Sequence, residues 1–330
     1  MQMEPNRRHV LATLSSAAAT LIGETAFAEE PPPEVTTIRL TKTPGICIAP
    51  QYVAEALLKI EGFRDIQYVE LPLDFVHRSA GTDKIDINMG FIASFVAELD
   101  LDAPITLLGG VHAGCFELFG TKRVSAIRDL KGKTVAVPAL GSAHHLFTAS
   151  MAAHVGLDER EINFVTYPVD ESAQLIAEEK VDALMGFPPV PQELREKKVG
   201  QVIVDSRLDR PWSQYFCCMV ASNREFARKH PVAAKRALRA ILKATNFCAA
   251  EPEQAARLVA AQGYPYNYAL QTMNEIRYAR WRDYDAEDTV RFYALHLREA
   301  GMIKSIPSKI IAQAADWRFF NELKRELKGG

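Results

Sequence analysis

Several signatures of common protein classes are missing from these 330 residues. The 39 Lys and Arg residues are matched by 41 Asp and Glu, for a net charge of −2. No basic field is therefore available to hold nucleic acid. G-x-G-x-x-G, H-E-x-x-H, G-x-S-x-G and EF-hand loops are all absent. Lys131-Gly132-Lys133-Thr134 ends like a phosphate-binding loop, but Ile127 stands where its first glycine is required. We therefore expect neither a cofactor nor an enzyme.

Cysteine is also scarce. The five residues form an odd set without any C-x-x-C pair, which argues against a disulfide framework. We expect buried free thiols and no metal. The cysteines are Cys47, Cys115, Cys217, Cys218 and Cys248.

The first 28 residues have the order of an export signal. Arg7 and Arg8 precede a mostly apolar stretch of 13 residues, and Ala26-Phe27-Ala28 fits a small-x-small cleavage site. The apolar stretch is too short for an ordinary membrane span, and no other candidate span follows. We predict cleavage after Ala28 and a periplasmic location. The arginine pair leaves the general and twin-arginine export routes both open.

An internal repeat organises the rest of the chain. Residues 84–91, K-I-D-I-N-M-G-F, are echoed by residues 180–187, K-V-D-A-L-M-G-F, and matching strand and helix patterns precede both. Each copy predicts β–loop–α–β–short α–β, so we expect two similar α/β lobes with mainly parallel sheets.

Connecting segments set the expected domain limits. An apolar stretch broken by glycines leads out of the first lobe, and a strand-like segment returns to it. Beyond residue 222 the pattern is helical, with Pro231, Pro252 and Pro307 placed to open helices. We predict lobe 1 at 36–118 and 216–330, including a C-terminal helical extension, and lobe 2 at 119–215. Two crossings predict a hinge, and the hinge predicts a ligand cleft.

Four loops are the candidate ligand site, because ligands collect at the carboxyl ends of parallel strands. The alternative is that their glycines serve only tight turns. Ser142 is placed to cap a helix, and its loop favours a polar oxygen or an anion. His144 and His145 point about 100° apart on a helix, so a metal would need help from elsewhere, for example from His112. Tyr215 either stacks on a ligand or packs in the core. The candidates are Gly45, Ile46, Cys47, Gly90, Phe91, His112, Gly141, Ser142, His144, Gly186, Phe187 and Tyr215.

Three stretches resemble one family of exported binding proteins. They are Ala49-Pro50-Gln51-Tyr52-Val53-Ala54, residues 129–137 (D-L-K-G-K-T-V-A-V) and residues 223–231 (N-R-E-F through H-P). With the repeat, they resemble the substrate-binding proteins of ABC importers of the nitrate/sulfonate/taurine type, which include binders of thiamine-pyrimidine precursors.

The resemblance implies a type II periplasmic-binding-protein fold, ligand capture by lobe closure and delivery to a membrane permease. It implies ligand contacts at Gly45, Gly90, Phe91, Ser142 and Gly186. We expect a monomer that binds a small anionic or polar organic molecule from the sulfonate, nitrate, taurine or pyrimidine-precursor classes.

Two alternatives stay open. One is an enzyme similar to a pyrimidine-precursor synthase. Such synthases have a cysteine-rich motif, and Phe216-Cys217-Cys218 resembles that motif only faintly. The other is a periplasmic sensor that reports ligand to a receptor.

Overall fold

The computed structural model describes residues 30–71 and 81–329. The expected export signal and its cleavage site lie outside these ranges. Pro32–Gly330 make up one compact unit, and the following description concerns that unit. The expected limits of two lobes inside it stay a prediction. Within the described ranges, no helix is both long and apolar enough to cross a bilayer.

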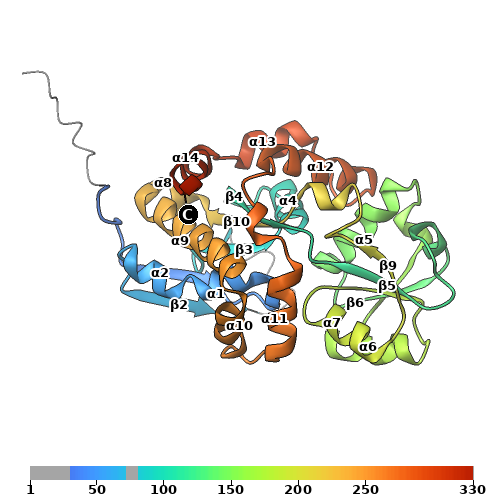
Figure 1. Cartoon of the computed structure of the whole chain (residues 1–330). Helices are drawn as coiled ribbons and strands as arrows, with labels where there is room; N and C mark the ends of the chain where they lie inside the picture. Colours follow the sequence, from blue (N-terminus) through green and yellow to red (C-terminus); the bar gives the residue numbers. More distant parts are fainter. Residues whose placement is uncertain (1–29, 72–80, 330) are drawn as a thin grey trace, which may run out of the picture. The chain divides into compact units, whose positions relative to one another are not determined.

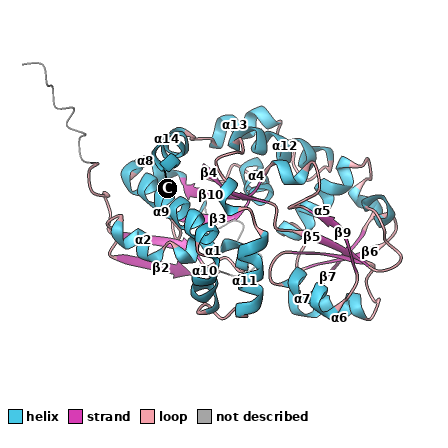
Figure 2. Ribbon diagram, in the orientation of Figure 1, coloured by secondary structure: helices cyan, strands magenta, loops and turns pink. Residues whose placement is uncertain are grey.

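Two five-stranded sheets form the centre of the unit (Figures 1 and 2). The first has the strand order β2-β1-β3-β10-β4, and the second has the order β7-β6-β8-β5-β9. The strands are β1 (Thr37–Thr41), β2 (Asp65–Val69), β3 (Ile87–Phe91), β4 (Ile105–Ala113), β5 (Glu117–Gly120), β6 (Thr134–Val137), β7 (Asn163–Thr166), β8 (Ala183–Gly186), β9 (Gln201–Asp205) and β10 (Phe216–Asn223).

The sequence repeat is a structural repeat. In the first sheet β1 pairs in parallel with β2 and β3, and in the second β6 pairs in parallel with β7 and β8. Each third strand then takes an antiparallel neighbour, β10 beside β3 and β5 beside β8. The expected α/β halves are therefore confirmed, but each sheet is mixed, because two of its four strand pairings are antiparallel. Their parallel strands end at corresponding edges, where ligands collect in such sheets.

Two segments connect the sheets, one leading out from β4 to β5 and one returning from β9 to β10. They are bonded to each other, since the amide of Ser206 donates to the carbonyl of Phe116 at 3.0 Å. Gly114 lies at this crossing with a φ of 49°, and a β-carbon there would lie 2.4 Å from the Ser206 carbonyl oxygen. Only glycine fits such a close approach.

Helices cover both sheets, and α9 packs on α1 and α2 while α12 contacts α4 and α5. The helices are α1 (Ala49–Val53), α2 (Glu55–Ile60), α4 (Ile92–Asp100), α5 (Ala143–His154), α6 (Val169–Ala177), α7 (Val190–Lys197), α8 (Arg224–Lys229), α9 (Pro231–Ala250), α10 (Pro252–Ala260), α11 (Tyr266–Glu275), α12 (Ala286–Glu299), α13 (Pro307–Ala314) and α14 (Arg318–Glu326). Short 3₁₀ turns include η1 (Ile46–Ile48) and η5 (Trp212–Gln214).

The expected helical extension is confirmed, with one correction. The pattern after Pro307 predicts one helix to Leu327, but the chain leaves the helix at Ala315, which is extended with a ψ of 118°. Ala315 forms a β-bridge with Leu107 on β4, and the amide of Asp316 donates to the Leu107 carbonyl at 3.2 Å. This pairing with a distant strand interrupts the helix, which the local sequence does not indicate.

Candidate functional site

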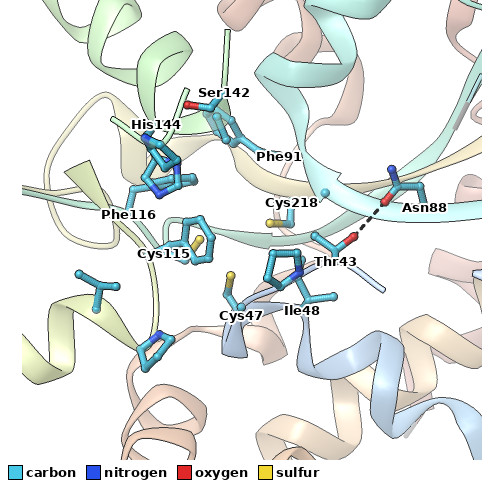
Figure 3. Close-up of a pocket in the computed structure, with 18 of the residues that line it drawn as sticks. Thr43, Cys47, Ile48, Asn88, Phe91, Cys115, Phe116, Ser142, His144 and Cys218 are labelled. Carbon is cyan, nitrogen blue, oxygen red and sulfur yellow. Dashed lines mark hydrogen bonds between the residues drawn. The ribbon is translucent and has the colours of Figure 1, made fainter. Parts of the chain in front are cut away.

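A cavity of about 270 Å³ lies where the loops after β1, β6 and β8 meet the end of β3 (Figure 3). Its volume is close to the lower end of the ~300–1,000 Å³ range of small-molecule sites. Both sheets contribute to its wall, as expected of a cleft at the carboxyl ends of parallel strands. The lining residues are Thr43, Pro44, Gly45, Cys47, Ile48, Asn88, Gly90, Phe91, Phe95, Cys115, Phe116, Pro138, Ala139, Ser142, Ala143, His144, Phe187, Pro189, Val190, Cys218 and Tyr264.

Most of the candidate residues predicted from the sequence meet at this cavity. From the first sheet's half come residues of the β1 loop, η1 and the end of β3. From the second come the start of α5 and the loop after β8. The seven predicted residues in the lining are Gly45, Cys47, Gly90, Phe91, Ser142, His144 and Phe187.

Five predicted residues lie outside the lining. Two of them, Ile46 and Gly141, make backbone hydrogen bonds within the loops instead. The amide of Ile46 donates to the Pro188 carbonyl at 3.0 Å. The amide of Gly141 donates to Nδ1 of His145 at 2.9 Å, and a β-carbon on Gly141 would meet nothing within 4 Å. Both residues shape the loops that carry the lining rather than contact the cavity.

The other three are Gly186, Tyr215 and His112. A β-carbon on Gly186 would meet Val190 at 3.1 Å, so this glycine lets α7 pack on the end of β8. The ring of Tyr215 stacks on Phe292 with centroids 3.9 Å apart, which is the packing role that the sequence left open. His112 is fully buried behind the lining, close to the thiols of Cys47, Cys115 and Cys218.

Several lining residues were missed by the sequence reasoning. Thr43 donates its hydroxyl to Oδ1 of Asn88 at 3.3 Å (Figure 3), and Asn88 is a polar residue inside the repeated strand pattern, which was an available signal. Tyr264 accepts the amide hydrogen of Gly45 at 2.6 Å from the connection between α10 and α11. No local signal could place Tyr264 there, because 219 residues separate it from Gly45.

The two adjacent histidines have different environments. His144 lines the cavity with its ring 4.9 Å from that of Phe187, whereas His145 packs against Phe164 and lies 3.5 Å from the carboxylate of Glu159. Burial lowers the pKa of His145, and Glu159 opposes that shift. Ser142 caps α5, its hydroxyl accepting the His145 amide hydrogen, so its expected capping role is confirmed. The start of α5 therefore borders the cavity with Ser142 and His144.

The lining is aromatic and uncharged. Phe116 makes edge contacts with the rings of Phe187 and His144, and it lies 4.9 Å from that of Phe91. The lining residues given above include no Lys, Arg, Asp or Glu. Polar groups come instead from hydroxyls, one amide, one imidazole and three thiols. Such a wall fits a flat molecule with a few hydrogen-bonding groups and leaves a full ligand charge without a counter-ion.

Contacts across the mouth hold the two halves together. Gly45, from the β1 loop, is so close to Phe187, from the β8 loop, that a β-carbon on it would lie 2.7 Å from the ring. On the far side of α7, Arg195 pairs with Glu275 of α11 at 2.7 Å and also with Glu117 of β5. Burial raises the pKa of Glu117, and the neighbouring arginines oppose that shift. The described structure is therefore a closed arrangement of the two halves.

All five cysteines are buried and free of disulfides, as expected. Four of them gather beneath the cavity, although they come from three separate stretches of the chain. The sulfur atoms of Cys115 and Cys217 lie 3.3 Å apart. Burial raises the pKa of the Cys115 thiol. Hydrogen bonds from Cys115, Cys217 and Cys47 hold the pKa of Cys218 well below its usual range.

Comparison with known families settles the relationship of this chain. A family model described as "NMT1/THI5 like" matches residues 55–255. The chain belongs to this family. A Saccharomyces cerevisiae relative, 4-amino-5-hydroxymethyl-2-methylpyrimidine phosphate synthase THI11, is 27% identical over 189 residues, which are 53% of this chain and 55% of the relative. The NMT1/THI5-like chain therefore spans about half the length of the curated relatives it matches.

Solved structures show the fold of this NMT1/THI5-like chain. The periplasmic nitrate-binding protein NrtA from Synechocystis PCC 6803 superimposes with a TM-score of 0.73 at 14% identity, over 91% of both chains. The alkanesulfonate-binding protein SsuA from Xanthomonas axonopodis pv. citri, bound to MOPS, gives 0.69 at 16% identity over 86% of this chain and 99% of that one. The expected periplasmic-binding-protein fold and the resemblance to nitrate- and sulfonate-binding proteins are confirmed.

Proposed function

We propose that this chain binds a small, uncharged, planar organic molecule in the cavity between its two sheets, without converting it. The composition of that cavity carries the proposal. Aromatic rings from both halves, Phe91 and Phe187 among them, line a partly open cavity that also offers the hydroxyl of Thr43 and the amide of Asn88. Rings give area and orientation to a flat ligand, and the few polar groups fix its register.

Within the classes expected from the sequence, the pyrimidine precursors fit best. A nitrate ion or an alkanesulfonate would bring a full negative charge, and taurine a sulfonate together with an ammonium group, into a lining that offers no charged side chain among its described residues. Burying such a charge without a partner is costly. A pyrimidine without its phosphate has none to bury, and its ring nitrogens and substituents match the hydroxyl and amide groups. The names of the curated relatives also contain a pyrimidine.

Closure of the two halves is the proposed mechanism. Contacts from both sheets make the ligand bind the closed form better than an open one, so binding shifts the population toward closure. The closed surface would then present the solute to the permease of an ABC importer. We propose export through residues 1–28 and a monomeric periplasmic protein. The structural neighbours named as periplasmic binding proteins support this. Amino-terminal sequencing of the exported protein should begin at Glu29.

A synthase-like enzyme is the second candidate. The curated relatives favour it, since they are named as pyrimidine phosphate synthases. The thiols of Cys47, Cys115 and Cys218 at the cavity give it reactive groups to use. The two functions differ in the fate of the bound molecule. A pyrimidine recovered unchanged after release by denaturant supports binding, whereas a chemically altered molecule supports the enzyme.

A thermal-shift series on refolded protein tests the proposal, because unfolding in urea first removes solute carried over from the host. The probes are 4-amino-5-hydroxymethyl-2-methylpyrimidine, its phosphate, taurine, an alkanesulfonate and nitrate. A ligand at a hundred times its Kd adds about 2.7 kcal/mol of stability. For a chain of this size that is a rise in Tm of a few degrees. We expect this rise with the uncharged pyrimidine.

Two threonine variants locate the site. Thr43→Val removes a hydroxyl that lines the cavity, whereas Thr148→Val removes one that donates to the His144 carbonyl inside α5. Binding should weaken about tenfold in the first variant, the loss of about 1.4 kcal/mol expected for one hydrogen bond, and should be unchanged in the second. A rise in Tm with the anions alone would refute the uncharged ligand. Equal effects of both variants would refute the placement of the site.

A further inference from the structure

Four side chains beneath the cavity have the identity and spacing of a metal site. Cys47 lies in η1, His112 near the end of β4, Cys115 directly after that strand, and Cys218 in β10. Their sulfur and imidazole nitrogen atoms all lie within 4.8 Å of one another. All four residues are buried, with at most 3% of any of them exposed. Figure 3 shows the three sulfur atoms turned toward a common point at one side of the cavity.

His112 supplies an independent observation. Its ring is fully buried, and Nδ1 lies 3.4 Å from the carbonyl oxygen of Ala113. Nε2 is buried and has no hydrogen-bond partner. A proton on Nδ1, facing that carbonyl, leaves Nε2 with a free lone pair. Buried polar atoms are nearly always partnered, so a buried, unpartnered nitrogen on a histidine of this thiol cluster points to a missing ligand.

The donor set defines the class of ion. Three thiolates and one imidazole are a standard closed set for tetrahedral zinc, with Zn–S distances of about 2.3 Å and Zn–N distances of about 2.0–2.1 Å. Neighbouring donors in such a tetrahedron are roughly 3.5–3.8 Å apart by that geometry. The observed limit of 4.8 Å requires side-chain shifts of only about 1 Å. We propose that Cys47, His112, Cys115 and Cys218 bind one thiophilic metal ion, of which zinc is the first candidate.

The position of the four residues says what the ion would do. His112 and Cys115 lie at the end of β4 and just after it, where the chain leaves the first sheet. Cys218 lies on β10, where the chain returns to that sheet, and Cys47 lies in η1 after β1. A metal ion would therefore tie both crossing segments to the first sheet's ligand loop. Three of its donors line the cavity, so the ion would form part of the cavity floor. This inference does not rest on the proposed function, because the ion needs no solute to bind.

Cobalt titration of the full chain is the direct test. The protein is reduced with a phosphine, stripped with a chelator and titrated with Co²⁺ alone. We expect one ion per chain, with the sulfur-to-cobalt charge-transfer absorption of bound thiolates and the strong visible bands of a tetrahedral site. Zn²⁺ should displace the cobalt. X-ray absorption of the zinc-loaded wild type should give three sulfur neighbours and one nitrogen neighbour, and this measurement needs no variant to fold.

Matched variants assign the donors. Cys47→Ser and His112→Gln should each weaken Co²⁺ binding at least about hundredfold, since even second-shell changes cost 10–100-fold. Cys248→Ser removes an equally buried thiol in α9 that lies outside the cluster, and it should leave affinity and spectrum unchanged. Circular dichroism melts establish that each variant is folded. No charge-transfer band in the reduced wild type, or a shell of oxygen and nitrogen only, would overturn the proposal.

Discussion

Gly45 is where one substitution tests the closed arrangement most directly. Its φ of 123° lies in a region that residues other than glycine rarely adopt. Such strain costs of order 1–3 kcal/mol in a substituted residue. A β-carbon there would also lie 2.7 Å from Cε2 of Phe187, well inside the ~3.5–4.0 Å of an ordinary carbon contact. Overpacking of this kind costs about 1–3 kcal/mol more. Gly45→Ala should therefore lower the free energy of unfolding by about 2–6 kcal/mol.

A double-mutant cycle separates the two costs. Phe187→Ala removes the ring that the new methyl group meets but leaves the backbone of residue 45 as it was. In that background Gly45→Ala should cost only the backbone strain of about 1–3 kcal/mol. The interaction free energy of the pair is then about 1–3 kcal/mol, the size of the overpacking cost. Gly141→Ala is the matched control, because Gly141 has a φ of 79° and open space around its missing β-carbon. It should cost about 1–2 kcal/mol.

Urea unfolding of the solute-free protein at 25 °C measures these quantities. Circular dichroism and tryptophan fluorescence followed together give coincident transitions when unfolding is two-state. The free energies then follow from the midpoint and slope. If the two substitutions add to within about 0.3–0.5 kcal/mol, the close contact between the halves is absent in solution and the closed arrangement is refuted.

Three further expectations concern charged groups. Glu275→Gln replaces the carboxylate that pairs with Arg207 across the two halves. The free energy of unfolding measured in urea should fall by about 1–3 kcal/mol. An unchanged free energy would show that this ion pair does not hold the halves together. The lowered pKa of His145 means that the unfolded chain takes up a proton first as pH falls below about 6.5. Stability should therefore be full above that pH and decline below it, and His145→Asn should flatten the decline in melts recorded from pH 7.5 to 5; an unchanged slope would contradict the assignment. Glu61→Ala removes a buried carboxylate that lies 2.9 Å from Arg239. The free energy of unfolding should fall by about 3 kcal/mol in the same urea assay. A fall of less than about 1 kcal/mol would mean that the pair contributes no more than an exposed salt bridge.

Local patterns were sufficient for the repeated part of the fold. Each half brings its own strand, loop, helix and glycine signals, and the predicted α/β order is present in both halves. The helix expected to continue from residue 307 ends before Ala315, because Ala315 pairs with a strand more than 200 residues earlier in the chain. Alternation and helical periodicity report what a segment prefers by itself, whereas such a pairing is set by the packing of remote segments.

The candidate site divides in the same way. The placement of the Gly45 and Ser142 loops and of Gly90 near the end of β3 follows from the sequence, because parallel strands direct their carboxyl ends to one edge. Tyr264 reaches the cavity only because the helical extension folds back over the β1 loop. The cluster of His112 with three thiols is likewise a product of tertiary structure. Its members come from three separate stretches of the chain, with only His112 and Cys115 close in sequence. The antiparallel pairing of β4 with β10, beside η1, brings their donor atoms together.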